Sequence, residues 1–123
     1  MTADQLKACL KIVDEYVRSA AGALISGIDR MTFQMLVNCL KSEDPEAVKE
    51  AIDQLAREGR PAAIPPLYVV SVAHPHPWVR QQAKGGLKSL VEEAELEELT
   101  RGKDVQDAVR ALIARFGHYK AKN

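Results

Sequence analysis

The fold of this chain is decided by residues 44–90, DPEAVKEAIDQLAREGRPAAIPPLYVVSVAHPHPWVRQQAKGGLKSL, which contain the same helical pattern twice. Asp44-Pro45 opens the first copy and His76-Pro77 opens the second. An offset of 32 residues then separates three apolar pairs: Ala47 and Val79, Ala51 and Ala83, and Leu55 and Leu87. A constant offset of this size is typical of stacked helical repeats, in which each unit buries its apolar face against its neighbours.

The first copy predicts a pair of antiparallel helices. Asp44 is a favourable N-cap, and Pro45 suits the first helical position because its missing N–H removes no hydrogen bond. Gly59 is expected to end this helix in a left-handed conformation. The turn that follows is short, so the next helix must return antiparallel against the first.

Residues 62–73 are the least regular part of the pattern. They contain Pro65 and Pro66, and their run of valines would also suit a buried strand. A strand here would have no partner, because no other segment resembles one. We therefore predict a helix that is apolar all round and covered on both sides, with a bent or delayed start at the two prolines.

The segment His74-Pro75-His76-Pro77 separates the two units, because two prolines disfavour a continuous helix. A new helix is predicted from Pro77 to about Ala94. Gly85 and Gly86 lie in its middle, where each costs about 1 kcal/mol relative to alanine. We expect that close packing of a neighbouring backbone explains them.

The flanking segments complete the predicted fold. Apolar residues at helical spacing indicate a long N-terminal helix ended near Gly27, a shorter helix that starts at Asp29 or Thr32, and a last helix stopped by Gly117. The acidic run from Glu92 to Glu98 is interpreted as a solvated helix end or turn. The sequence thus predicts an all-α fold of six helices in about three antiparallel hairpins, with one domain over residues 1–117 and a tail over 118–123.

Composition disfavours several classes of function. Lys plus Arg equal Asp plus Glu at 17 each, so no net field attracts nucleic acid or an acidic membrane. No segment approaches the roughly 18 consecutive apolar residues of a membrane span.

Cys9 and Cys39 both lie on apolar stripes, where a free thiol behaves as a small hydrophobe, although they could pair if the first two helices pack antiparallel. The N-terminus carries charged residues rather than an apolar signal core, which favours the cytoplasm.

The residues Pro77-Trp78-Val79-Arg80 with Ala83 and Leu87, and the related stretch from Asp44 to Lys49, resemble the first helix of HEAT-type repeats. The similarity is closest to the short HEAT-like units of bilin-lyase-related proteins, and Ala62-Ala63-Ile64-Pro65 resembles their second helix. This resemblance implies a short right-handed α-solenoid that serves as a protein-binding scaffold. It also implies that Arg80 bridges to an acidic residue of the adjacent unit.

Four residues near the repeat turns are the predicted partner-binding residues: Tyr68, His74, His76 and Trp78. Large aromatic side chains can anchor a partner and dominate its binding energy, while burial between repeats is the alternative role for Tyr68 and Trp78. His74 and His76 also invite a metal interpretation, which His118 could complete. No cysteine or carboxylate is near in sequence, so we predict a structural or surface role, with no metal and no cofactor.

Catalysis finds little support in the sequence, which has no glycine-rich phosphate loop and only Ser71 near a histidine. The prediction is a non-enzymatic protein-binding scaffold or adaptor whose partner is another protein. One alternative, from the resemblance, is an accessory subunit of an enzyme such as a chromophore lyase, or an assembly chaperone. A weaker one is nucleic-acid binding through Arg101, Lys103, Arg110, Arg115, Lys120 and Lys122. Self-association stays open, because three repeats are near the minimum for a solenoid.

Overall fold

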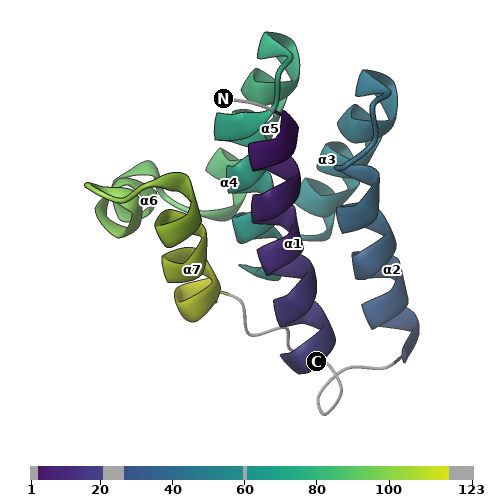
Figure 1. Ribbon diagram of the computed structural model, residues 1–123, viewed down its shortest axis with the longest axis horizontal. Coiled ribbons are helices and arrows are strands. Elements are labelled where there is room, and N and C mark those ends of the chain that lie inside the picture. The colour runs from purple at the N-terminus through teal and green to yellow at the C-terminus, as the bar shows by residue number, and fades with distance from the viewer. Residues whose placement is uncertain (1–2, 21–26, 60, 117–123) are drawn as a thin grey trace.

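The computed structural model describes residues 3–20, 27–59 and 61–116 (Figure 1). These residues contain seven α-helices, one 3₁₀ turn and no strand, which confirms the all-α prediction. The elements are α1 (Ala3–Ala20), α2 (Gly27–Cys39), α3 (Pro45–Glu58), η2 (Pro61–Ala63), α4 (Ile64–Ala73), α5 (Pro77–Leu90), α6 (Glu93–Thr100) and α7 (Val105–Phe116). Each of the helices in this part of the chain is too short or too polar to cross a lipid bilayer.

Helices α3 and α5 are equivalent members of a repeat. Both are 14 residues long, and both ends of α5 are displaced by 32 residues from those of α3. The two helices pack side by side, and the Gln82 side chain of α5 donates a 2.6 Å hydrogen bond to Asp53 of α3. The repeat inferred from the sequence is therefore a real structural unit.

The ends of α3 follow from local chemistry. The Asp44 carboxylate accepts a 3.1 Å hydrogen bond from the N–H of Glu46, as an N-cap residue should. At the other end Gly59 adopts a φ of 68°, and its N–H donates to the carbonyl of Ala56. A side chain with a Cβ would be strained there, which is why glycine ends this helix.

Helix α4 lies at the centre of the molecule and packs against α1, α5 and α7. The predicted delayed start takes the form of the turn η2, after which Pro65 and Pro66 occupy the first turn of α4, where their missing N–H groups remove no hydrogen bond. All its residues are buried except Tyr68 and Val72, which are half-buried. The prediction of a helix covered on both sides is confirmed, and the strand alternative is excluded.

The N-terminal helices continue the stack, because α2 packs on α3 and α1 packs on α4. Helix α2 begins at Gly27, so the prediction of an N-cap at Asp29 or Thr32 was wrong: both positions lie inside the helix. The prediction that Gly27 ends the first helix was also wrong, because Gly27 is the first residue of α2; α1 is described as far as Ala20, and residues 21–26 lie outside the described residues. Helices from every part of the chain contribute to one hydrophobic core.

The C-terminal third differs from the prediction. Helix α5 ends at Leu90 rather than near Ala94, because Val91 is extended. The acidic run is not a loose helix end but the separate short helix α6, whose Leu96 and Leu99 pack against the core. The third hairpin is therefore interrupted, and α7 packs on α6, α4 and α1. The predicted tail, residues 118–123, lies outside the described residues.

Two expectations about single residues need correction. Close packing of a neighbouring backbone was expected at both mid-helix glycines. Gly86 does permit the close approach of α3, but the neighbour is a side chain, because an added Cβ would lie 3.4 Å from the Cβ of Ala56. At Gly85 an added Cβ would meet nothing within 4 Å. Both cysteines are free thiols, and only Cys9 is buried. Cys39, the last residue of α2, is exposed.

Candidate protein-interaction surface

The turn between α4 and α5 is held by a set of short polar contacts. The backbone N–H of His76 donates a 3.1 Å hydrogen bond to Nδ1 of His74. Nη1 of Arg80 donates to the carbonyl of His74 at 2.6 Å and to that of Pro75 at 3.3 Å. Arg80 has the structural role expected of it, but the acidic partner implied by the HEAT resemblance is replaced by two backbone carbonyls.

Three of the four predicted partner-binding residues lie together on this turn. The ring centroids of His74 and His76 are 5.5 Å apart, and those of His76 and Trp78 are 6.4 Å apart. Their exposure differs sharply: His74 is 4% exposed, whereas Trp78 is 44% exposed. His76 and Trp78 therefore present an aromatic surface to solvent, and His74 supports it from beneath.

A pocket of about 190 Å³ adjoins this aromatic surface. His74, Pro75 and His76 form one wall, and the turn between α2 and α3 forms another through Lys41, Ser42 and Glu43. Leu6 and Lys7 of α1 complete the lining. The two turns are related by the repeat, since Ser42 and His74 are 32 residues apart. We had not predicted the residues of the first turn as part of a site, although the repeat offset points to them.

Tyr68 lies apart from the other three predicted residues. It is half-buried on α4 and lines a different surface groove, of about 290 Å³, bounded by α4, α5 and α6. Burial raises the pKa of its phenol, and this outweighs the opposing effect of the nearby Thr100 of α6. The four residues therefore do not form a single site.

The protonation of His74 is set by its surroundings. Burial lowers the pKa of its imidazole, and His76 and the Arg80 guanidinium lower it further because both disfavour a second positive charge. A neutral ring leaves Nδ1 free to accept the hydrogen bond from His76. Among the described residues no three histidine, cysteine or acidic side chains lie close enough to hold a metal ion, and His118 lies outside them.

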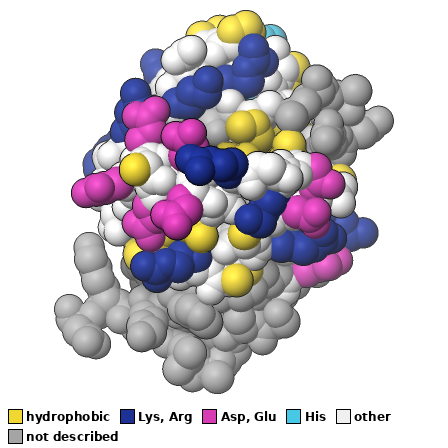
Figure 2. Space-filling view, turned by 90° about the vertical axis from the view of Figure 1, so that its left-hand side faces the viewer, with side chains coloured by type: hydrophobic (Ala, Val, Ile, Leu, Met, Phe, Trp, Pro, Cys, Tyr) yellow, Lys and Arg dark blue, Asp and Glu magenta, His cyan; other side chains and the backbone are white. Residues whose placement is uncertain are grey.

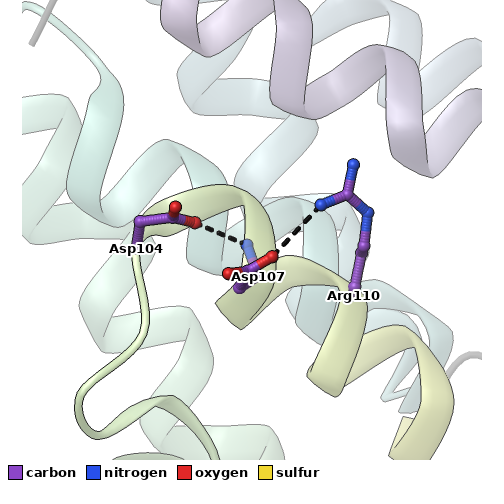
Figure 3. Close-up of polar contacts among 3 residues, drawn as sticks. All are labelled: Asp104, Asp107 and Arg110. Atoms are coloured by element: carbon purple, nitrogen blue, oxygen red, sulfur yellow. Dashed lines mark hydrogen bonds and ion pairs between the residues drawn. The ribbon is translucent and has the colours of Figure 1, made fainter.

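The basic residues of the C-terminal quarter are largely neutralised. Arg110 pairs with Asp107 at 3.2 Å, next to the Asp104 carboxylate that caps α7 by accepting the N–H of Asp107 (Figure 3). Arg101 pairs with Glu97, and Arg115 pairs with Glu95. On the side of the molecule where α6 lies, basic and acidic side chains alternate, without a field of one sign (Figure 2). This arrangement does not favour a phosphate-binding surface. Lys120 and Lys122 lie outside the described residues.

Paired helices of equal length, packed in series around an apolar central helix, define an α-helical repeat protein. The family model for HEAT repeats matches residues 3–88 and 34–116 of the chain. The chain therefore belongs to the HEAT-repeat family, whose repeats generally act as scaffolds for interactions between proteins. Neither a curated protein nor a solved structure matches the sequence significantly.

Proposed function

We propose that the chain is a cytoplasmic, non-enzymatic adaptor that binds another protein through the turn between α4 and α5. The observation that carries this proposal is the exposure of Trp78, one of the two large hydrophobic side chains that are exposed among the described residues. Tryptophan is enriched at the energetic centres of protein interfaces, because it buries a large area with little loss of conformational freedom. Scaffolding is also the general role of HEAT repeats.

The turn is well suited to this role because its backbone is already ordered. Arg80 ties the end of α4 to the first turn of α5, and His74 fixes the backbone of His76. A surface that is ordered before binding loses less entropy when the partner docks. We assign direct contact with the partner to His76 and Trp78, and a positioning role to the buried His74.

The pocket beside His76 supports the same assignment. Its volume of about 190 Å³ is below the usual range of small-molecule sites, so it suits one or two side chains of a protein partner better than a cofactor. Lys7 and Glu43 provide charges of both signs at its rim. Such a recess next to an exposed tryptophan resembles the pockets that surround interface anchors.

Alanine substitution tests the proposal. A partner recovered with the tagged wild-type chain should bind Trp78→Ala about tenfold more weakly or worse, because an anchor of this kind contributes more than about 1.4 kcal/mol. The affinity is measured by calorimetry with the purified partner. Met35→Ala is the matched control, since Met35 is 64% exposed on α2 and far from the turn in sequence. If Trp78→Ala folds normally and keeps full affinity, the assigned surface is wrong.

A further inference from the structure

The groove that contains Tyr68 is explained neither by the fold nor by the proposed surface. Its floor is apolar and includes Val72 of α4, Leu87 of α5 and Leu96 of α6. Its volume of about 290 Å³ is at the lower limit of small-molecule sites, so it fits a few side chains better than a whole ligand. The groove thus has the character of a docking surface for a helix.

The repeat relates this groove to a position that is filled elsewhere in the molecule. Gly86 of α5 packs against Ile52 and Ala56 of α3. The equivalent positions in the next repeat, 32 residues later, are Lys84 and Lys88, and both of these residues line the groove. The side of α5 at the groove is therefore equivalent to the side of α3 that receives α5. One further helix could stack there in the same way.

The charges at the groove differ from those at the filled position. Lys84 and Lys88 are one helical turn apart and exposed, whereas their counterparts Ile52 and Ala56 are apolar. No ion pair or hydrogen bond joins either lysine to another described residue. A helix that stacks here as α5 stacks on α3 would lie over both lysines, so their ammonium groups would have to meet carboxylates of the incoming helix or extend past it to solvent. Such a helix is therefore favoured if it carries carboxylates opposite them.

We infer that the groove between α4, α5 and α6 receives an amphipathic helix of another protein that carries two carboxylates one turn apart beside its apolar stripe. This inference rests on the proposed protein-binding function but assigns a second, separate surface. Glu93 on the α6 side of the groove is available to pair with a basic residue on the opposite edge of the incoming helix. Tyr68 contributes to the apolar wall rather than to the turn surface, which explains its separation from His76 and Trp78.

The test uses synthetic helical peptides of one length with leucines at positions i, i+3, i+4 and i+7. One peptide carries two glutamates four residues apart beside the stripe, and two matched peptides carry glutamine or lysine there. Fluorescence anisotropy with the full chain should show the glutamate peptide binding about fivefold more tightly than the glutamine peptide and more tightly still than the lysine peptide. The preference should weaken as salt is raised.

Charge reversal in the protein makes the test specific. The double variant Lys84→Glu, Lys88→Glu should bind the lysine peptide in preference to the glutamate peptide. Lys49→Glu, an exposed lysine on the equivalent helix α3, should leave the order unchanged. Three results would overturn the inference: the glutamate and lysine peptides bind equally well, the order of affinities is unchanged in the double variant, or no peptide binds. Self-association of the wild-type chain that the double variant abolishes would assign the groove to a second copy and also overturn it.

The two proposals fail separately. Trp78→Ala should leave binding of the glutamate peptide unchanged, because Trp78 does not line the groove. If Trp78→Ala no longer binds the natural partner and no peptide binds the chain, the proposal for the groove is wrong and the proposal for the turn surface stands. If peptide binding depends on charge as expected and Trp78→Ala keeps full affinity for the natural partner, the proposal for the turn surface is wrong and the proposal for the groove stands.

Discussion

At the scale of single residues, His74 makes the stability of the folded state depend on pH. The pKa of His74 lies below its usual value of 6.5 in the folded chain, whereas the unfolded chain titrates near that value. The unfolded state therefore binds more protons just below pH 6.5. The contribution of His74 to stability is complete above that pH and declines as the pH falls towards the lower, folded pKa.

We expect His74→Asn to flatten this decline, because asparagine cannot titrate and its side-chain oxygen can still accept the N–H of His76. Denaturant unfolding between pH 7.5 and pH 5 measures the effect. One proton limits the removed slope to about 1.4 kcal/mol per pH unit. His76→Asn is the control and should keep most of the decline, because it leaves the buried imidazole in place. Equal slopes for wild type and His74→Asn would contradict this account.

The same residues show how far sequence reasoning reaches at this scale. The grouping of His74, His76 and Trp78 was predictable, because they alternate along one short turn. Their different exposure was not, since it depends on how the turn packs in the folded chain, where His74 shares a pocket with residues of α1 and of the turn before α3. The acceptors of Arg80 were also missed, because the HEAT resemblance implied an acidic partner and a family resemblance does not fix which oxygen atoms a side chain meets.

At the scale of secondary-structure elements, helix α5 contains an avoidable weakness. Gly85 lies in mid-helix, is exposed, and has no neighbour within 4 Å of an added Cβ. Gly85→Ala should raise the free energy of unfolding by about 1 kcal/mol, measured by urea denaturation, because alanine loses less backbone entropy. Gly59→Ala should lower it instead, since its φ of 68° strains any residue with a Cβ. A destabilising Gly85→Ala would mean that this glycine has a role that the contacts do not reveal.

Helices α3 and α5 were predictable because their caps and prolines are local signals that the sequence displays directly. Helix α6 was not, because an isolated helix of 8 residues is unstable in water and this one depends on packing. Leu96 and Leu99 pack against the core, which offsets its acidic composition. The same tertiary contact directs the chain after α6 so that α7 reaches α4 and α1, which the repeat pattern did not indicate.

At the scale of the whole molecule, contact between α1 and α7 joins the two ends of the described chain. A longer solenoid transmits stability only between neighbouring repeats, so distant parts can unfold separately. Here the helices share one core, with α4 in contact with the first helix, the last helix and α5. We therefore expect one cooperative transition, as in other small domains.

Leu112→Ala in α7 tests this expectation at a site remote in sequence from the only tryptophan, Trp78 in α5. Leu112 is fully buried, so the substitution should lower the free energy of unfolding by about 2–5 kcal/mol. If the core is shared, tryptophan fluorescence and far-ultraviolet circular dichroism should move to the same lower denaturant midpoint with an unchanged slope. A dichroism transition that shifts while the fluorescence transition stays in place would mean that α7 unfolds alone, and that the repeats behave as independent units despite the contact between the chain ends.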